Sequence, residues 1–578
     1  MTRATGRPRS ALLAAGLATT LVLAAGCTPE GDTGTEDQAT HTRDDGTTAA
    51  PPSDPEALTS LVASAATEPV VLDAPEAAGL SAQASGQFFD RAPVVVLAGE
   101  QDQLRAASAA LSLGVPVLVD GPEVADELER LGTEVALVVG DVTDPGVDVV
   151  VAEDEDRLRE LADLQGDPVA VSEDEQVAAL AEAEPGELLS GDGATESATE
   201  GDAASSTADT AGSTAAAGEP LESDLDELPL TEPPEQVPGV TVLATGDVAE
   251  TAAVATARAA GARVVVSPEP DPRASTESVQ ALADGEPGAV VALGDGTDAE
   301  TLGWQARAAA SGVELPGGGQ LTLPGKTYVA LYGTPSTPSL GVLGEQAPEE
   351  TIARAQEHAA WFESLTDQPV VPTLEIIATV ASADAGADGN YSNELPVEEL
   401  EPLVDLAGEH GIYVVLDLQP GRTDFLTQAK LYEDLLRRPH VGLALDPEWR
   451  LGPDERHLVQ IGSVGIDEVN EVVTWLADLT RDEGLPQKML VLHQFRISMI
   501  GDTDQVDRSR SELAVVLHVD GQGGQLDKQA TWSALHQNAP SIDYWGWKNF
   551  YDEDVPAPLT PEETMSQVDP VPDFITYQ

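Results

Sequence analysis

The strongest constraint on the fold of this chain is a regular alternation of apolar runs and helical stretches in its C-terminal part. Short apolar runs occupy residues 328–332, 371–380, 412–418, 441–445, 489–492, 513–519, 542–547 and 574–577. Helical patterns lie between them, at residues 348–365, 397–410, 424–438, 466–481 and 528–537. Continuous apolar runs that alternate with helices are typical of buried parallel strands. Eight such units in about 250 residues match the count and length of a (β/α)8 barrel. We therefore expect an α/β protein whose residues 321–578 form a TIM-like barrel.

Two shorter blocks with the same texture precede the predicted barrel. The first has apolar runs at 93–99, 115–120 and 135–141, and the second repeats them at 240–246, 262–267 and 289–295. The runs share their spacing and end in Gly or Gly-Asp, which indicates an internal duplication of three-layer α/β blocks. We place these blocks at 57–183 and 237–320.

The segments between these blocks have a different composition. Residues 184–236 are rich in Ala, Ser, Thr, Glu and Asp and contain few large apolar side chains. Residues 27–56 are similarly polar. Such segments cannot bury enough apolar surface to fold, so we predict an acidic disordered linker and a disordered tether.

The N-terminus has the pattern of an export signal. Three arginines lie within the first ten residues, and an apolar run follows at 11–25, too short to span a bilayer. The run ends Leu23-Ala-Ala-Gly-Cys27, which resembles the lipobox of bacterial lipoproteins. It departs at Ala24, where that motif favours Leu. The resemblance implies a signal peptide at 1–26, cleavage before Cys27, and lipid attached to Cys27 on the outer face of the plasma membrane. An ordinary secretory signal with a chance cysteine is the alternative.

Charge limits the partners of the chain. The sequence has 102 acidic against 28 basic residues and a net charge of -74. Binding nucleic acid requires clustered Lys and Arg, so nucleic acid is not an expected partner. An anionic membrane surface would also repel the chain, and contact with the lipid bilayer is expected only through the acyl chains on Cys27. Cys27 is the only cysteine, so no internal disulfide is possible.

Each α/β block is similar to the cell wall-binding repeat of bacterial surface proteins. The first block carries Gly114-Val-Pro-Val-Leu118 and Leu131-Gly132, which match that repeat. It lacks the Arg-aromatic-x-Thr-Ala element that opens the repeat and the Asp-Ala-Leu of its first helix. The resemblance implies wall binding, and a plain α/β scaffold is the alternative. A nucleotide site is disfavoured because no Gly-x-Gly-x-x-Gly or Walker pattern is present.

The ends of the predicted barrel strands are polar, and chemistry in such barrels occurs where strands end. Buried charge is costly unless it is paired or used, so these residues predict a site. The polar positions are Tyr332, Glu375, Asp417, Asp446, Glu448, His493, Gln494, His518, Asp520 and Lys548.

The sharpest element of this set is Asp446-Pro447-Glu448. Residues two apart on a strand point to the same side, which places two carboxylates together. Neighbouring carboxylates separate their pKa values, as glycoside hydrolysis requires. Asp-x-Glu after strand four also resembles several barrel glycosidases, and this resemblance implies that Glu448 is the general acid and that Asp446 tunes it. Asp417 or Asp520 would be the base or nucleophile, a choice that stays open because strand seven ends in Trp and Lys.

The sequence therefore predicts a cell-surface lipoprotein that hydrolyses an envelope polysaccharide or peptidoglycan without a cofactor or metal. Tryptophans 449, 545 and 547 offer flat faces for sugar rings, with Tyr332 and Tyr391 beside them. The predicted substrate contacts are Trp449, Trp545, Trp547, Lys548, His493, Gln494, His518, Tyr332 and Glu375.

Two other functions remain open. The first is a non-catalytic protein that binds glycan or cell wall. The second is a metal-dependent hydrolase, in which His493, His518, Asp520, Asp446 and Glu448 would be the ligands. The His-x-His on strand one that amidohydrolase barrels use is missing. Serine chemistry has no support, because no Gly-x-Ser-x-Gly occurs.

The whole predicted barrel is also similar to a set of uncharacterised actinobacterial-type lipoproteins. The shared phrases are Val-Leu-Asp-Leu-Gln-Pro-Gly-Arg at 415–422 and Trp-Gly-Trp-Lys-Asn-Phe at 545–550. This resemblance implies a lipoprotein but no activity.

Overall fold

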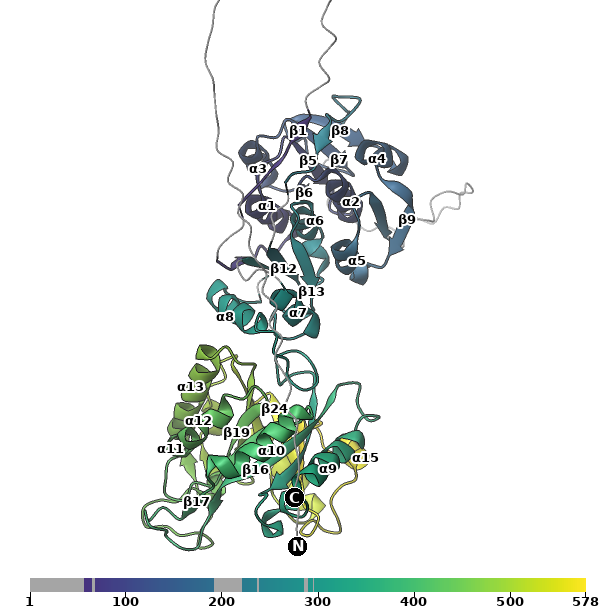
Figure 1. Cartoon of the computed structure of the whole chain (residues 1–578). Coiled ribbons are helices and arrows are strands. Elements are labelled where there is room, and N and C mark those ends of the chain that lie inside the picture. Colours follow the sequence, from purple (N-terminus) through teal and green to yellow (C-terminus); the bar gives the residue numbers. More distant parts are fainter. Residues whose placement is uncertain (1–56, 65–67, 192–220, 236–238, 285–288, 295) are drawn as a thin grey trace, which may run out of the picture. The chain divides into compact units, whose positions relative to one another are not determined.

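A computed structural model describes residues 57–64, 68–191, 221–235, 239–284, 289–294 and 296–578 (Figure 1). The predicted signal peptide, the lipidation site Cys27 and the tether lie outside these residues, as does the stretch 192–220 of the predicted linker. Within the described ranges, no helix combines the length and the apolar character that a membrane span needs.

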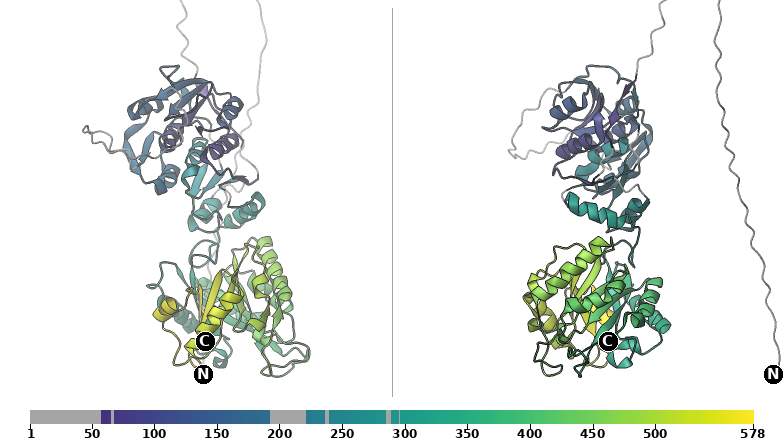
Figure 2. Two further views of the ribbon diagram at one scale, coloured as in Figure 1. Left: turned by 180° about the vertical axis from the view of Figure 1, so that it is seen from behind. Right: turned by 60° about the vertical axis from the view of Figure 1, so that its left-hand side comes forward.

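The C-terminal part of the chain is a closed barrel of eight parallel strands, which confirms the predicted fold class (Figures 1 and 2). The strands are β15 (Thr327–Gly333), β16 (Val370–Ala381), β18 (Tyr413–Leu418), β19 (Val441–Leu445), β21 (Lys488–His493), β23 (Leu513–Val519), β24 (Tyr544–Asn549) and β25 (Phe574–Tyr577). Each strand pairs in parallel with the next, and β15 closes the barrel between β25 and β16. A short antiparallel strand, β17 (Ser392–Glu394), extends the far end of β16.

Alternation along each strand sorts side chains into two cores. Outward residues such as Ile376 and Leu416 pack under the surrounding helices. Those helices are α9 (Pro348–Ala360), α10 (Val397–Glu409), α11 (Phe425–Ala429), α12 (Glu433–Leu436), α13 (Ile466–Asp482), α14 (Gln525–Asn538) and α15 (Pro561–Gln567). Inward residues such as Tyr328, Val415 and Met489 fill the lower half of the barrel with apolar side chains. The polar residues of the candidate site lie above this layer, at the carboxyl ends of the strands.

The N-terminal part contains two parallel four-stranded sheets with the same strand order. The first, β6-β5-β7-β8, comprises β5 (Val94–Ala98), β6 (Val117–Val119), β7 (Val135–Val139) and β8 (Asp148–Ala152). The second, β13-β12-β14-β3, comprises β12 (Val240–Ala244), β13 (Arg263–Val266), β14 (Ala289–Leu293) and β3 (Val70–Leu72). The shared order agrees with the predicted duplication. The second sheet, however, takes its fourth strand from residues that precede the first sheet.

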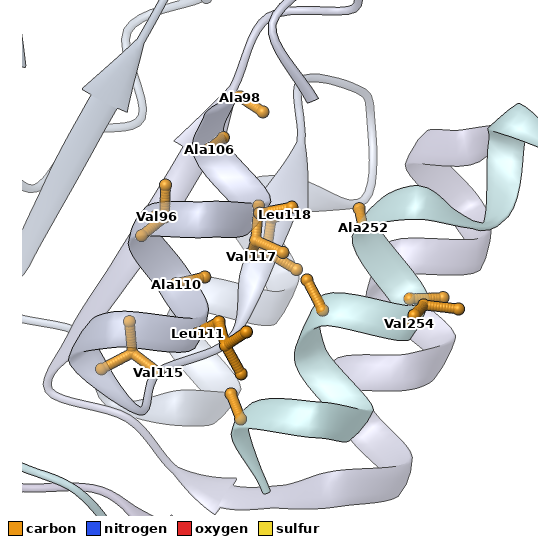
Figure 3. Close-up of a cluster of buried hydrophobic side chains, with 14 of the residues drawn as sticks. Val96, Ala98, Ala106, Ala110, Leu111, Val115, Val117, Leu118, Ala252 and Val254 are labelled. Atoms are coloured by element: carbon orange, nitrogen blue, oxygen red, sulfur yellow. The ribbon is translucent and has the colours of Figure 1, made fainter. Parts of the chain in front are cut away.

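The two sheets are joined by one hydrophobic core (Figure 3). Helix α6 (Thr251–Ala259) contacts α1 (Ala77–Phe88) and α2 (Gln103–Leu113) through small side chains, which allow close approach. Figure 3 shows α6, which carries Ala252 and Val254, beside the strand β6, which carries Val117 and Leu118. The Val254 side chain points away from that strand. The Thr256 hydroxyl accepts a hydrogen bond of 3.1 Å from the Val117 N–H.

Regular structure extends into the range 184–236 that the composition marks as linker. Strand β10 (Glu187–Gly191) pairs with β9 (Gln165–Val171), and β11 (Thr231–Glu232) pairs with β1 (Leu58–Thr59). Leu188 and Leu189 are buried. Two adjacent leucines are enough to anchor a strand here, which overall composition does not reveal.

Candidate functional site

The upper layer of the barrel interior is polar, and every strand contributes one side chain to it. This follows from strand parity, because each residue lies two or four positions beyond an inward-facing apolar one. From β15 to β25 the residues are Tyr332, Glu375, Asp417, Asp446, His493, His518, Lys548 and Thr576. All are buried. The structure thus brings together seven side chains that the sequence predicted at the site and adds Thr576.

His493 lies at the centre of the layer between two carboxylates. Its Nε2 is 2.7 Å from Oε1 of Glu375, and its Nδ1 is 3.0 Å from Oδ2 of Asp520. Asp417 is a third acidic neighbour, with Oδ1 4.0 Å from Nε2. Burial favours the neutral ring, but the charges and hydrogen bonds of Glu375 and Asp520 raise the pKa of His493 well above its ordinary value. These contacts favour the protonated form of the His493 ring.

Tyr332 connects Asp417 to Lys548. The Tyr332 hydroxyl donates to Oδ2 of Asp417 at 2.8 Å and accepts from Nε2 of Gln419 at 3.3 Å. The Lys548 ammonium lies 3.4 Å from the centre of the Tyr332 ring, a cation–π contact. Burial raises the pKa of Asp417 to about 6. Asp417 is therefore buried in the barrel wall and held there by the Tyr332 hydroxyl.

His518 contributes a neutral imidazole beside His493. Its Nε2 is 3.0 Å from the Thr576 hydroxyl, and the two histidine rings are 4.7 Å apart, edge to face. Burial, followed by the positive charge of His493, lowers the pKa of His518 well below its ordinary value. Gly546 on β24 leaves space for this ring, because a Cβ there would come within 2.7 Å of Cδ2 of His518.

Asp446 and Glu448 both face the site, but not because they share a strand, as the sequence suggested. Strand β19 ends at Leu445, and Pro447–Trp449 form one turn of 3-10 helix. Pro447 lacks the N–H that would continue the ladder, and the Asp446 carboxylate caps the turn by accepting from the Glu448 N–H at 3.3 Å. The cap is what places the Glu448 side chain near Asp446.

A pocket of about 590 Å³ opens above the polar layer. Its floor and walls include six predicted residues, namely Tyr332, Asp446, Glu448, Trp449, Asp520 and Lys548. It also includes residues that the sequence did not single out, among them Gln419, Phe495, Arg496, Lys528 and Phe550. Glu375, Asp417, His493 and His518 do not line the pocket. They lie in the wall and support the residues that do.

Several predicted substrate contacts lie elsewhere. Trp545 and Trp547 are buried in the outer core, where both pack against Trp532 of α14. They occupy the outward positions of β24, and Gly546 and Lys548 occupy the inward ones. Gln494 is also buried, and its amide donates to the carbonyl of Arg496. Tyr391 packs under the guanidinium of Arg422, away from the pocket. Only Trp449 remains as a tryptophan face in the pocket.

The two pocket carboxyls Glu448 and Asp520 titrate in opposite directions. Burial raises the pKa of Glu448 to about 7, and the negative charge of Asp520 adds to this. Burial also acts to raise the pKa of Asp520, but the hydrogen bond from His493 and the charges of His493 and Lys548 hold it below its ordinary value. For Asp446, burial and the neighbouring Asp417 raise the pKa well above its ordinary value. Near neutral pH these surroundings thus favour an ionised Asp520 beside a Glu448 that is partly protonated.

The buried wall also contains the one group of possible metal ligands found in the described part of the chain. Ligand atoms of Glu375, His493 and His518 lie within 4.8 Å of one another. However, both ring nitrogens of His493 already contact carboxylate oxygens. The 2.7 Å between Nε2 and Glu375 is a hydrogen-bond length. The arrangement thus fits a proton shared by the cluster.

Sequence reasoning missed Thr576, Gln419 and Lys528. Thr576 follows two residues after the inward Phe574, so parity on the last strand could have found it. Lys528 lies on α14, where its ammonium forms a buried ion pair with Asp554 and donates to the Lys548 carbonyl at 2.7 Å. A lysine in a predicted helix reads as a surface residue, and nothing in the sequence distinguishes this one.

In the second N-terminal sheet, a carboxylate of the protein itself fills the space beside the glycine that follows β12. After β12, the carboxylate of Glu250 accepts hydrogen bonds from the backbone N–H groups of Thr245 and Gly246, at 2.9 Å each. Glu250 is buried, and burial raises its pKa. A side chain of the protein itself thus occupies the position that a phosphate would need.

Comparisons with known proteins give little further guidance. No protein-family model and no curated protein matches the sequence. Similar solved structures include Cwp6 and Cwp8 from Clostridium difficile. Cwp6 is 13% identical, with a TM-score of 0.30, and the match covers 56% of this chain and 64% of Cwp6. Cwp8 is 14% identical, with a TM-score of 0.27, and the match covers 43% of this chain and 52% of Cwp8. The chain thus spans less than two thirds of either protein, and likeness at this level carries no argument about function.

Proposed function

We propose that the protein is a cell-surface glycoside hydrolase that acts on an envelope polysaccharide, with Glu448 as general acid and Asp520 as the second carboxylate. One observation carries the proposal: Glu448 and Asp520 line the same pocket, and their surroundings push their pKa values apart. Glycoside hydrolysis uses such a pair, one carboxyl protonated and the other ionised. The surface location rests on the export signal and on the likeness of its end to a lipobox.

The choice of Asp520 over Asp417 follows from position and charge. Asp520 lines the pocket and is held ionised, whereas Asp417 lies in the wall and is bonded to Tyr332. Burial and the charge of Asp417 raise the pKa of Asp446, and its carboxyl caps the turn that carries Glu448, so it positions the acid.

In the proposed reaction, Glu448 gives its proton to the glycosidic oxygen as the bond to the anomeric carbon breaks. Asp520 stabilises the positive charge that develops on the sugar ring. It then either accepts a proton from the attacking water or bonds to the anomeric carbon, depending on the spacing of the two carboxyls when substrate is bound. The second route requires water to release the sugar from Asp520, with Glu448 accepting the proton of that water. The covalent route restores both carboxyls directly, whereas after the direct route Asp520 must release a proton to water and Glu448 must take one up before the next turnover.

The lining of the pocket suits a sugar. Aromatic faces from Trp449, Phe495 and Phe550 offer apolar contact to the faces of the ring, and Lys548 and Gln419 supply donors for hydroxyl groups. The pocket volume of about 590 Å³ lies within the range of about 300–1,000 Å³ that is usual for small-molecule sites. The mixture of flat apolar faces and polar groups therefore supports a glycan rather than a purely apolar ligand.

The test is release of reducing ends from a panel of envelope polysaccharides, peptidoglycan included. The protein used is residues 28–578, which keep the whole compact unit Pro55–Gln578. We expect Glu448→Gln and Asp520→Asn each to reduce kcat/KM by about 10²–10⁴-fold without unfolding the chain. Asp454→Asn, an exposed carboxylate on the loop after β19, is the matched control. If the wild type binds a glycan of the panel but releases no reducing ends, the protein is a binder and the proposal fails.

A further inference from the structure

The strongest feature that the proposed reaction leaves unexplained is the buried chain Glu375–His493–Asp520. The side chains of Glu375 and His493 are 0% exposed, and that of Asp520 is 8% exposed. An ionised carboxylate only accepts hydrogen bonds, so a ring held between two of them must donate from both nitrogens. With both carboxylates ionised, this geometry corresponds to an imidazolium in the barrel wall.

The two oxygens of Asp520 have different environments. Oδ2 accepts from His493 at 3.0 Å, whereas Oδ1 has no hydrogen-bond partner among the described residues. Asp520 also lines the pocket. His493 thus holds one oxygen of Asp520, while the other is buried and has no partner within the described residues.

The charged and titratable groups around this chain come from every neighbouring strand. They are Tyr332, Glu375, Asp417, Asp446, Glu448, His518, Asp520 and Lys548, together with Lys528 from α14. Lys548 and Lys528 are the other cations. His493 is the one cation that bonds directly to Asp520, and with the charge of Lys548 it favours an anionic Asp520 beside Glu448 and Asp446.

We propose that His493 is a positioning residue, an imidazolium anchored by Glu375 that holds the Asp520 carboxylate ionised and directed into the pocket. This inference rests on the proposed function, in which Asp520 is the reacting anion. A neutral structural histidine donates from one ring nitrogen and accepts at the other. His493 instead joins a wall carboxylate to a pocket carboxylate through both nitrogens.

The first experiment is independent of any substrate. Residues 28–578 labelled with ¹⁵N-histidine are examined by NMR from pH 6 to pH 9, and His493→Asn assigns the signal that disappears. We expect one imidazole to keep both ring N–H protons, shifted downfield, at pH 8, where an unperturbed histidine is neutral. A neutral His493 ring at pH 7 would overturn the proposal. So would about one equivalent of a divalent ion in the purified protein whose removal by EDTA shifts the His493 signals, because the same cluster would then be a metal site.

The second experiment uses the pH dependence of kcat/KM on the polysaccharide that the wild type cleaves. We expect His493→Gln to move the acidic limb upward by about 1–3 pH units, because Asp520 loses its cationic partner, and to leave the alkaline limb in place. Glu375→Gln, which keeps the shape of the wall, should move the same limb in the same direction by less. KM should change little, since His493 does not line the pocket.

A matched control comes from the opposite end of the barrel. His440, which precedes β19, bonds to the Val404 carbonyl, and His440→Asn should leave both limbs unmoved. If His493→Gln does not fold, Glu375→Gln and the NMR signal carry the test. An equal loss of activity at every pH in Glu375→Gln would indicate a purely structural role and sink the inference. If no polysaccharide is cleaved, the NMR result still decides whether the ion pair exists, so failure of the function and failure of the inference are distinguished.

Discussion

Individual protons decide what the polar layer of the barrel can do. Three of its carboxyls, those of Asp417, Asp446 and Glu448, have pKa values raised first of all by burial. The other two acids, Glu375 and Asp520, contact the imidazolium of His493. Lys548 supplies a second positive charge. Five acids at one site, four of them buried, can be tolerated when some are protonated and the others are matched by cations.

This distribution of protons predicts a bell-shaped pH dependence of kcat/KM. Glu448 must be protonated to act as acid, so the rate should fall as the pH rises through about 7. Asp520 must be ionised, so the rate should also fall in acid. Because the pKa of Asp520 is lowered, this fall should occur at a pH below the ordinary pKa of an aspartate. The measurement is initial rates on the cleaved polysaccharide from pH 3 to pH 9. A rate that continues to rise between pH 7 and pH 9 would contradict the assignment of Glu448.

Gly546 predicts a steric effect at a single position. An alanine Cβ there would lie 2.7 Å from Cδ2 of His518 and 3.2 Å from the Phe574 ring, closer than packed atoms approach. We expect Gly546→Ala to lower the free energy of unfolding by about 1–3 kcal/mol, measured by denaturant titration. Gly501→Ala is the control, because its nearest neighbour would be 3.9 Å away. Equal stability of the two variants would mean that the wall around His518 can adjust.

At this scale the sequence predicted which residues are polar at strand ends, but not which way they point. Tyr332, Glu375, Asp417, His493 and Lys548 meet because parallel strands place their carboxyl ends together. Trp545 and Trp547 look equally suitable in the sequence, yet they share the outward parity of β24. A one-residue change of register would exchange the two sets, so the assignment needs the pairing of neighbouring strands.

Among the elements, α14 and the segment after β24 are joined by a buried ion pair. Lys528 is 3% exposed and Asp554 is 0% exposed in their side chains, and Asp554 also accepts from the Phe550 N–H at 3.1 Å. Phe550 lines the pocket, so the pair connects the start of a helix to the pocket wall.

Breaking this pair should be costly. We expect Lys528→Met to lower the free energy of unfolding by about 3–5 kcal/mol, because Asp554 would remain buried and charged without its partner. Lys430→Met, at an exposed lysine, should change stability by less than about 0.5 kcal/mol. The double variant Lys528→Met/Asp554→Asn should recover part of the loss, as calorimetry or denaturant titration would show. If stability does not recover, the loss in Lys528→Met comes from lost packing and not from an unpaired Asp554.

The strands of the barrel could be predicted because each is a local pattern. An apolar run such as 441–445 is followed directly by a charged residue. A few consecutive positions therefore indicate both the buried strand and the residue at which it ends. The turn at Pro447–Trp449 could not be placed, because it depends on the Asp446 cap. The pairing of β3 with β14 was equally hidden. Val70–Leu72 is a three-residue run, and only its distant partner makes it a strand.

Across the whole molecule, the N-terminal sheets depend on segments far apart in the chain. Strand β3 pairs with β14, and α6 closes the core over α1 and α2. The sequence showed two similar blocks separated by a polar segment, a pattern that equally fits two independent domains. Composition cannot separate these cases, because an alanine-rich helix face is equally suited to packing within one block and to packing between two blocks.

The shared core predicts that the two blocks fold as one unit. A protease site introduced within residues 192–220 should cut the chain without separating its parts, because contacts such as Thr256 to Val117 remain. We expect the two fragments to co-elute in size-exclusion chromatography and to unfold in one transition near that of the uncut chain.

Residues 57–191 produced alone should fail to fold cooperatively, since they lack α6 and leave the apolar surfaces of α1 and α2 uncovered. A cooperative transition for residues 57–191 at the temperature of the whole chain would instead show two independent domains. The uncut chain with the same inserted site is the control, because it separates the effect of the cut from that of the insertion.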